Sequence, residues 1–309
     1  MSAAADHLIG RCSFPPAGSA VTCAVSGGAD SLALLALAVR AGTQATAVHV
    51  DHGLRPGSGE EADVVADAAR LLGAGFRAER VRVAPGPNLE ARARRARYGV
   101  LPPGVLTGHT ADDQAETVLL NLVRGAGLDG LAGYDPATRP LHRLRRTETH
   151  ALCADLALQP VHDPSNLDDR FRRNRVRHEL LPLLDAIAER DVAAVLAGQT
   201  GHLRDDLALL ESLAAAIDPT DARALAAAPA PLARRALRAW LRAGEECHPP
   251  DAAAVERVLA VARGEALGCQ LPGGRSVRRS RQRLVLLPAG GPGQGHGGAG
   301  GAPPVTLPG

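Results

Sequence analysis

A chain of 309 residues with a formal net charge of +2 is long enough for two domains and is not a general polycation. Its five cysteines are far apart and form no C-x-x-C pair, which argues against a zinc ribbon or iron–sulfur site and predicts reduced thiols. The first ten residues lack the apolar core of a signal peptide and no apolar run reaches membrane-spanning length, so we expect a cytoplasmic protein without a membrane partner.

The first half of the chain alternates short apolar runs with helical patterns. Four runs predict strands, at 21–25, 45–50, 77–83 and 104–107. Four segments predict helices, at 30–40, 60–72, 88–98 and from about residue 110. This alternation is typical of an α/β fold with a doubly wound parallel sheet. Ligands of such sheets bind beyond the carboxyl ends of the strands.

The turn between the first strand and its helix reads Ser26-Gly27-Gly28-Ala29-Asp30-Ser31. Glycines allow a sharp turn, and the start of the helix offers free N–H groups to an anion, so the turn predicts a phosphate site. A Walker loop is excluded because no lysine follows, and the chain contains none. The three-glycine dinucleotide fingerprint is also absent. The alternative is a simple Gly-Gly turn.

A second polar group begins the helix after the fourth predicted strand. His109, Asp113 and Glu116 are spaced to share one helical face near the same edge of the sheet. Two carboxylates beside a phosphate turn could bind Mg²⁺ or hold a substrate ammonium group. The alternative is a polar helix start whose acidic residues complement the helix dipole.

Arginines supply all the basic residues other than histidine, and they occur in clusters. The clusters comprise Arg92, Arg94, Arg95 and Arg97, then Arg143, Arg145 and Arg146, then Arg172, Arg173, Arg175 and Arg177. Such concentration in a nearly neutral chain favours a nucleic-acid surface, and the shortage of aromatic residues favours a structured RNA held by its backbone. The alternative is a solvated face paired with local Asp and Glu.

The second half of the chain becomes helical from about residue 147. A long amphipathic helix is predicted at 191–217, followed by Ala-rich helices to residue 263. Short strand-like runs between 267 and 287 flank Gly273-Gly274, which indicates a hairpin. We therefore expect a first domain at 1–190, a linker helix at 191–217, a small α+β domain at 218–289 and a disordered Gly/Pro tail at 290–309.

Six blocks in this order resemble the tRNA(Ile)-lysidine synthetase family of PP-loop ATP pyrophosphatases. They span 26–31, 48–55, 88–98, 107–117, 124–130 and 163–177. The resemblance covers about the first 180 residues and is weaker in the C-terminal part. It implies that the first domain is a PP-loop ATP-binding catalytic domain and that the small C-terminal domain contacts tRNA. Longer members of the family carry a second C-terminal domain.

The resemblance implies an ATP-dependent ligase that joins free L-lysine to the wobble cytidine of a tRNA(Ile) with a CAU anticodon. The reaction would pass through an adenylated tRNA and release AMP and diphosphate, with ATP as co-substrate and Mg²⁺ as cofactor. A homodimer is left open. The alternatives are another PP-loop tRNA-modifying enzyme, such as a thiolase, or a non-catalytic nucleotide- or RNA-binding module. A thiolase would call for paired active-site cysteines, which the sequence does not show.

The same resemblance assigns roles to residues of this chain. Residues Ser26, Gly27, Gly28, Ala29, Asp30 and Ser31 would bind ATP, and Asp30 would also contact Mg²⁺. Asp113 and Glu116 would bind the lysine amino group. The residues expected to act in catalysis are Asp30, His109, Asp113 and Glu116. The residues expected to contact tRNA are Arg94, Arg97, Arg172, Arg173, Arg175 and Arg177.

Overall fold

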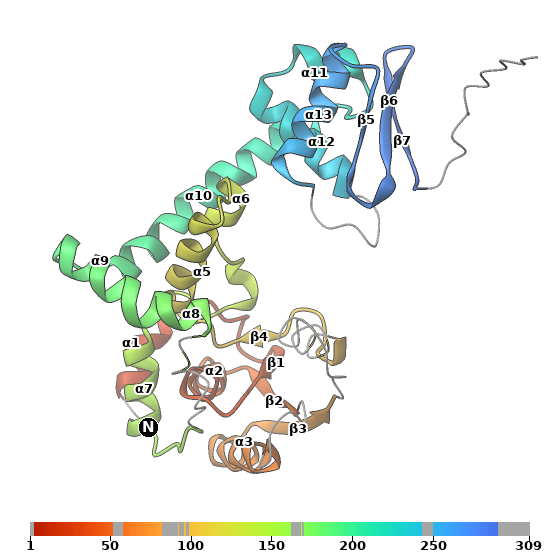
Figure 1. The fold of residues 1–309 in the computed structure, drawn as a ribbon. Coiled ribbons are helices and arrows are strands. Elements are labelled where there is room, and N and C mark those ends of the chain that lie inside the picture. The colour runs from red at the N-terminus through yellow and green to blue at the C-terminus, as the bar shows by residue number, and fades with distance from the viewer. Residues whose placement is uncertain are drawn as a thin grey trace, which may run out of the picture. The chain divides into compact units, whose positions relative to one another are not determined.

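The computed structural model describes residues 3–51, 58–81, 99–161, 170–242 and 250–289, together with residues 92, 96 and 168. The chain divides into two compact units, Met1–Asp205 and Asp206–Gly309. Each unit has its own hydrophobic core and is described by itself (Figure 1). None of the described helices combines the length and apolar character that crossing a membrane requires.

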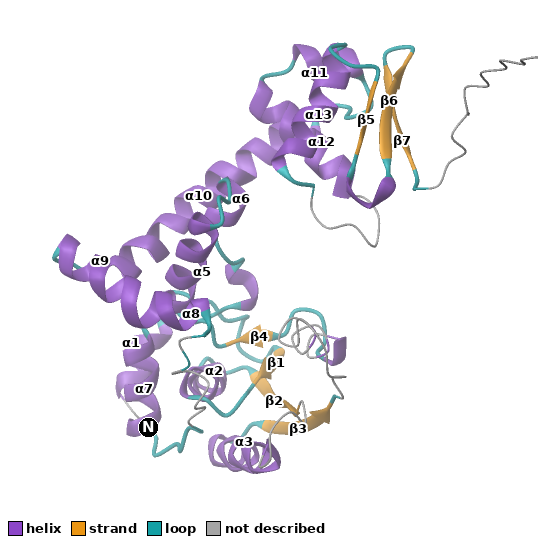
Figure 2. Ribbon diagram, in the orientation of Figure 1, coloured by secondary structure: helices purple, strands orange, loops and turns teal. Residues whose placement is uncertain are grey.

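The first unit contains a parallel four-stranded sheet in the order β3-β2-β1-β4. Its strands are β1 (Ala20–Ala24), β2 (Gln44–Asp51), β3 (Gly75–Arg80) and β4 (Leu106–Thr107). Helices α2 (Ala29–Arg40) and α3 (Ser58–Leu72) follow β1 and β2, because parallel neighbours need a crossover connection (Figure 2). The predicted parallel α/β fold is confirmed. The predicted helix at 88–98 lies largely outside the described residues.

Apolar side chains pack against the inner strands of this sheet, whereas β3 is largely exposed. The main core packs β1 and β2 against α1 (Ala3–Ile9), α2, α3 and α7 (Arg146–Asp155). Helix α2 lies at its centre, with four leucines fully buried: Leu32, Leu34, Leu35 and Leu37. On β2, Val48 joins a separate small cluster with Leu101 and Val105. The faces of the inner strands are thus occupied by apolar packing, which leaves the strand ends for polar groups.

The first unit contains further helices after β4. They are α5 (Ala111–Val123), α6 (Leu128–Leu131), α8 (Arg172–Arg175), a π-helical segment (Val176–Leu180), α9 (Leu181–Ala188) and α10 (Val192–Ala215). A small apolar cluster that includes Ala115, Val176 and Ala193 joins α5 to the π-helical segment and to α10. The helix expected at 191–217 is observed as α10. The division between the two units falls within this helix.

The second unit combines three helices with a three-stranded antiparallel sheet. The elements are α11 (Ala222–Ala227), α12 (Ala230–Arg242), α13 (Ala252–Arg263), β5 (Gly268–Gln270), β6 (Ser276–Ser280) and β7 (Arg283–Leu287). Strands β5 and β6 pair on either side of Gly273-Gly274, which confirms the predicted hairpin. Strands β6 and β7 pair with each other and are joined by a turn at Arg281 and Gln282, which both have positive φ. The predicted tail at 290–309 lies outside the described residues.

Candidate active site

The predicted phosphate turn connects β1 to α2. Gly27 has φ +89°, and a Cβ there would lie 3.2 Å from a methyl group of Val161, so glycine fits both the backbone angle and the space. The Ser31 hydroxyl donates to the Gly28 carbonyl at 2.8 Å, and its oxygen lies 3.2 Å from the Ser26 amide. Gly28 caps α2 without a side-chain hydrogen bond. The turn is therefore internally braced, and the start of α2 has no side chain of its own as a cap.

A second turn, between β4 and α5, lies against the first. A Cβ on Gly108 would be 2.5 Å from the Asp30 carbonyl oxygen, so only glycine permits this approach. Helix α5 then begins with a capping box, in which the Thr110 amide and hydroxyl both donate to Asp113 Oδ2, at 2.9 and 3.1 Å. The close approach at Gly108 brings Asp30 on α2 near Asp113 and Glu116 on α5.

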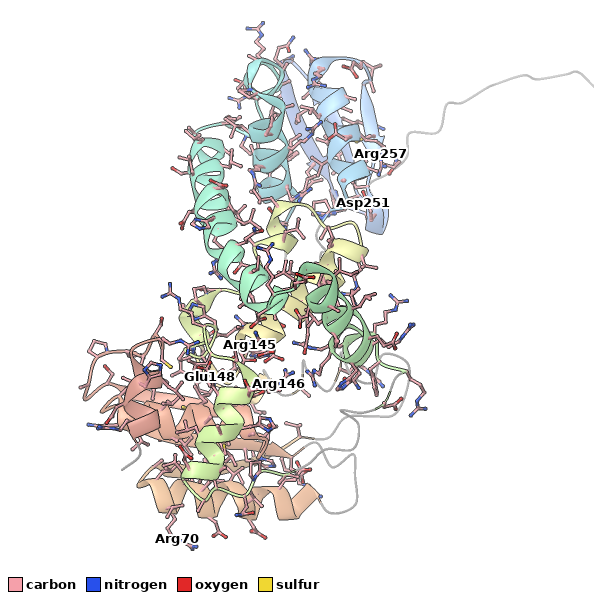
Figure 3. The ribbon with its side chains drawn as sticks, turned by 90° about the vertical axis from the view of Figure 1, so that its left-hand side faces the viewer. Arg70, Arg145, Arg146, Glu148, Asp251 and Arg257 are labelled. Atoms are coloured by element: carbon pink, nitrogen blue, oxygen red, sulfur yellow. The ribbon has the colours of Figure 1, made fainter. Side chains whose placement is uncertain are left out.

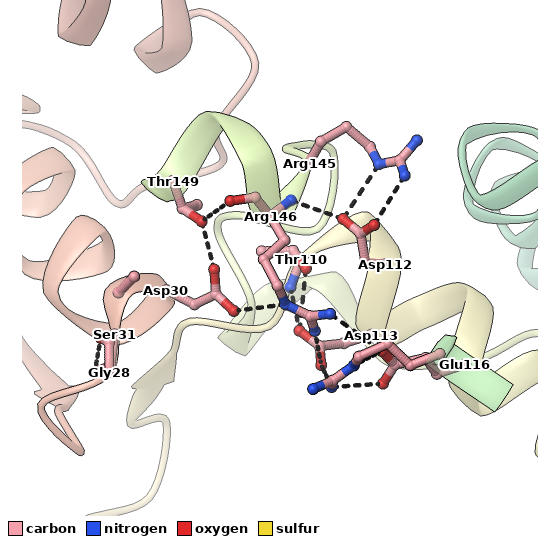
Figure 4. A network of polar contacts seen from close by, with 12 residues as sticks. Gly28, Asp30, Ser31, Thr110, Asp112, Asp113, Glu116, Arg145, Arg146 and Thr149 are labelled. Atoms are coloured by element: carbon pink, nitrogen blue, oxygen red, sulfur yellow. Dashed lines mark hydrogen bonds and ion pairs between the residues drawn. The ribbon is translucent and has the colours of Figure 1, made fainter. Parts of the chain in front are cut away.

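Asp30, Asp113 and Glu116 form what we call the carboxylate cluster, and Arg146 links all three (Figure 4). The Arg146 nitrogens Nε, Nη2 and Nη1 lie 3.3 Å from Asp30, 3.0 Å from Asp113 and 3.3 Å from Glu116, respectively. The Thr149 hydroxyl also donates to Asp30. Because Arg146 and Thr149 both lie on α7, this helix joins the carboxylates of α2 and α5 through polar contacts, in addition to its apolar packing against α2.

Two arginines, one on α8 and one on the π-helical segment, complete the charge balance. The Nε atoms of Arg173 and Arg177 each lie 2.6 Å from a Glu116 oxygen, and Arg173 also lies 3.1 Å from Asp113. The Glu116 side chain is fully buried. The neighbouring Asp112 instead pairs with Arg145 at 2.8 Å. Three carboxylates therefore meet three guanidinium groups, which is how a buried charge is tolerated.

Figure 3 places Arg145, Arg146 and Glu148 together at the start of α7. Glu148 accepts from the Arg145 backbone amide at 2.7 Å and pairs with Arg11. Arg70, also labelled, lies on α3 and pairs with Asp67 on its own helix. Arg11 thus joins elements that are distant in sequence, whereas Arg70 pairs within its own helix.

The two aspartates of the cluster differ in acidity although they share Arg146. Burial raises the pKa of Asp30, and the Thr149 hydrogen bond and the Arg146 charge only partly oppose it. Burial acts in the same direction on Asp113, but Arg146 and Arg173 outweigh it and lower the pKa of that carboxyl. Asp113 is therefore a stable anion, whereas folding disfavours the charged form of Asp30.

His109 precedes α5, and its Nδ1 lies 2.8 Å from the Thr107 hydroxyl oxygen. Its ring centroid is 5.1 Å from that of Tyr134, and its charged form contributes to the lowered pKa of Asp113, after burial and the two arginines. All four residues expected to act in catalysis thus belong to one polar region. Their proposed roles remain predictions.

The arginines predicted to contact RNA are divided by the structure. Arg172 and Arg175 are exposed, and Arg175 pairs with Glu179 at 2.8 Å. Arg173 and Arg177 instead turn inward to the carboxylate cluster. Arg94 and Arg97 lie outside the described residues. Sequence reasoning did not place Arg146, Thr149 or Tyr134 in the site: Arg146 stood in a basic run, and the other two carried no signal.

The fold and the site define the class of protein to which the first unit belongs. Residues 4–184 match the PP-loop domain family, which covers more than half of the chain. A U34-tRNA thiolase, NcsA from Methanococcus maripaludis, superposes with a TM-score of 0.53 at 16% identity, over 65% of this chain and 78% of the thiolase. That likeness concerns the fold alone. The first unit is a PP-loop ATP-binding domain.

Relatives over almost the full chain narrow this class. A tRNA(Ile)-lysidine synthase from Nocardia farcinica is 46% identical over 91% of this chain and 94% of its own length. The synthases of Rhodococcus erythropolis and Mycobacterium tuberculosis are 43% and 41% identical, over 86% and 85% of this chain and 89% of theirs. Residues 221–285 match the TilS substrate binding domain. The chain belongs to the tRNA(Ile)-lysidine synthase family, whose members are ATP-using ligases, and the thiolase alternative is not favoured.

Proposed function

We propose that this protein joins L-lysine to the wobble cytidine of a tRNA(Ile) with a CAU anticodon. In the first step, the cytidine carbonyl oxygen attacks the α-phosphate of ATP and diphosphate leaves. In the second, the ε-amine of lysine displaces AMP from the adenylated base. Such transfers depend mainly on positioning and on charge stabilisation. Together the two steps call for a phosphate site and a cation site side by side.

The single observation that carries this proposal is the meeting of the phosphate turn with the carboxylate cluster. Asp30 lies on the first turn of α2, two residues after Gly28, and Asp113 and Glu116 approach it from α5. The turn would bind the phosphates of ATP through backbone N–H groups. Asp113 and Glu116 already hold cations, and an ammonium group between two carboxylates makes the same charge-assisted bonds.

The charge balance of the cluster predicts an order of binding. Three guanidinium groups already neutralise three carboxylates, so an incoming ammonium adds an uncompensated positive charge unless one guanidinium leaves. ATP phosphates offer an arginine a comparable bidentate partner. We therefore expect ATP to draw a guanidinium away from the cluster and so to strengthen lysine binding. Calorimetry of lysine binding with and without a non-hydrolysable ATP analogue measures this coupling.

The described residues do not fit a resident Mg²⁺ ion. Among them no three His, Cys, Asp or Glu side chains gather as metal ligands. The oxygens of Asp30 accept from Thr149 and Arg146, and those of Glu116 from arginines. We therefore assign Mg²⁺ to the co-substrate, because the ion is commonly held by nucleotide phosphates and water. A direct contact from Asp30 stays a prediction.

Diphosphate release with purified tRNA tests the reaction as a whole. We expect release to depend on a tRNA(Ile) with a CAU anticodon, and lysidine to be found by mass spectrometry of the digested tRNA only when lysine is present. Diphosphate release that does not depend on tRNA, or a modified cytidine formed without lysine, would contradict the proposal. The same assay rejects a non-catalytic binding module, which would release no diphosphate.

The division of labour within the cluster has a separate test. We expect Glu116→Gln to raise the lysine concentration needed for transfer while the adenylated tRNA still forms, as followed by rapid quench. Asp112→Asn is the matched control, since Asp112 lies on the same helix but its carboxylate pairs with the Arg145 side chain and with the backbone amide of Arg146, not with a guanidinium group of the cluster. Loss of adenylation with normal lysine binding would assign Glu116 to the nucleotide instead.

A further inference from the structure

The ring of His109 is held on more than one side. Its Nδ1 lies 2.8 Å from the Thr107 hydroxyl oxygen at the end of β4. The same hydroxyl donates to the Thr138 carbonyl oxygen at 3.2 Å. The ring of Tyr134 lies 5.1 Å from the imidazole, inclined by 53°. Thr107 and Tyr134 together fix both the position and the plane of the imidazole ring.

The direction of these hydrogen bonds determines the tautomer. A carbonyl oxygen can only accept, and a hydroxyl group has a single hydrogen to donate. With that hydrogen directed to Thr138, the Thr107 oxygen acts as an acceptor toward His109. In this arrangement, which keeps the hydrogen bond to the Thr138 carbonyl, Nδ1 supplies the hydrogen between His109 and Thr107. In the neutral ring, Nε2 therefore carries the lone pair.

Tyr134 is itself firmly fixed, so it can hold the imidazole ring in place. The guanidinium carbon of Arg139 lies 4.2 Å from the centre of its ring. Its hydroxyl contacts Thr117 and Arg173, and its backbone amide donates to the buried Gln114 at 3.0 Å. These contacts come from α5, from α8 and from Arg139, and together they restrict the aromatic ring more than burial alone would.

We propose that Thr107 and Tyr134 are positioning residues that hold His109 as the Nδ1–H tautomer, so that its Nε2 accepts the proton of the incoming lysine amine. This inference rests on the proposed function. In the step, an N–H bond of the ε-ammonium breaks and the proton moves to Nε2, leaving a neutral amine and an imidazolium. The amine lone pair then forms the new C–N bond, the C–O bond to AMP breaks, and AMP leaves with the electron pair. The nitrogen gives up its second proton to the phosphate of the departing AMP.

The surroundings suit this role. His109 begins the segment that leads into α5, one helical turn before Asp113. Asp113 is ionised, since Arg146 and Arg173 overcome the effect of burial on its pKa. The imidazolium that forms would thus face a carboxylate, and the ionisable side chains of Tyr134, Arg139 and Arg173 also lie at the ring stack. An anion beside the imidazolium favours uptake of the proton.

Nuclear magnetic resonance of ¹⁵N-labelled histidine tests the tautomer without reference to activity. The signals of His109 are identified by their loss in His109→Gln. We expect the Nδ1–H pattern in the wild-type protein and in Thr107→Ser, and a shift toward the Nε2–H pattern in Thr107→Val. Thr43→Val is the matched control, because Thr43 is also buried and also donates to a carbonyl, that of Ala38, on the far side of α2. An Nε2–H pattern in the wild-type protein would overturn the inference.

Rapid-quench kinetics then tests the consequence. General base catalysis is worth roughly 10²–10⁴-fold, so we expect Thr107→Val to slow lysine transfer about 10²-fold, with adenylation, Thr107→Ser and Thr43→Val close to wild type. Tyr134→Phe should retain most of the rate, and Tyr134→Leu should not. If Thr107→Val shifts the tautomer and leaves the transfer rate unchanged, His109 is not the base. If the wild-type protein forms no lysidine at all, the proposed function fails, while the tautomer measurement still stands.

Discussion

Glu116→Gln removes the charge of the most enclosed carboxylate in the cluster. The Glu116 side chain is fully buried, and nitrogens of Arg146, Arg173 and Arg177 lie 2.6–3.3 Å from its oxygens. The replacement amide keeps one acceptor oxygen but turns an NH₂ group toward groups that can only donate. One guanidinium then lacks a counter-charge inside the protein.

Removing one partner of a buried ion pair costs about 3–5 kcal/mol, whereas an exposed pair contributes about 0–1 kcal/mol. The three arginines remain 21–34% exposed, so water compensates part of the loss. We therefore expect the free energy of unfolding of the first unit to fall by about 3 kcal/mol. Urea denaturation followed by circular dichroism measures this change.

The single tryptophan provides an internal control. Trp240 lies on α12 and packs against the core of the second unit, so its fluorescence follows that unit alone. We expect Glu116→Gln to leave the Trp240 transition unchanged. The double variant Glu116→Gln/Arg177→Gln loses one negative and one positive charge, so the charges of the cluster balance again. Its loss of unfolding free energy should be smaller than the sum of the losses in the two single variants. A loss below about 1 kcal/mol, or strict additivity, would refute the view of Glu116 as the centre of a buried charge network.

Asp30→Asn should abolish diphosphate release without lowering the stability of the protein at pH 7. Burial raises the pKa of Asp30, so its charged form costs stability once the pH exceeds the folded pKa. A lower midpoint of urea unfolding would contradict this. The effect of Asp113 on stability has the opposite sign. Its lowered pKa stabilises the folded protein above the unfolded pKa, and this stabilisation is lost as the pH falls through the folded pKa. Asp113→Asn should therefore flatten the acid limb of a curve of unfolding free energy against pH. Arg172→Gln should reduce the log–log salt slope of tRNA binding by about one unit, whereas Arg173→Gln should leave the slope unchanged, as filter binding at several salt concentrations can show.

The parallel sheet and the phosphate turn could be predicted because their signals are local. Apolar periodicity gives the strands, and the glycines at 27 and 28 mark the turn within a few residues of both elements. The meeting of Asp30 with Asp113 and Glu116 was also accessible, since strand ends in such a sheet share one edge. The β6–β7 turn was not, because Arg281 and Gln282 adopt positive φ without the usual Asn or Gly.

The inward arginines could not be predicted, because their partners are distant in sequence. Arg172 and Arg175 share one helical face, and Arg173 and Arg177 share another, so the spacing alone divides the run in two. Nothing in the sequence says which face meets α5, and the whole run has the composition of a nucleic-acid surface. Gly108 is similar: its need for glycine arises only when α2 approaches it.

The two aspartates of the cluster behave differently although both pair with Arg146. This arginine contacts both with separate nitrogens, at 3.3 Å for Asp30 and 3.0 Å for Asp113, yet only Asp113 gains a second guanidinium from Arg173. Asp30 therefore keeps a net cost of burial that its neighbour does not. A carboxylate whose charge destabilises the folded protein gains from any cation or hydrogen-bond donor that a ligand brings. Asp30 is thus where we expect substrate binding to change the charge balance most, and where activity and stability should separate on mutation.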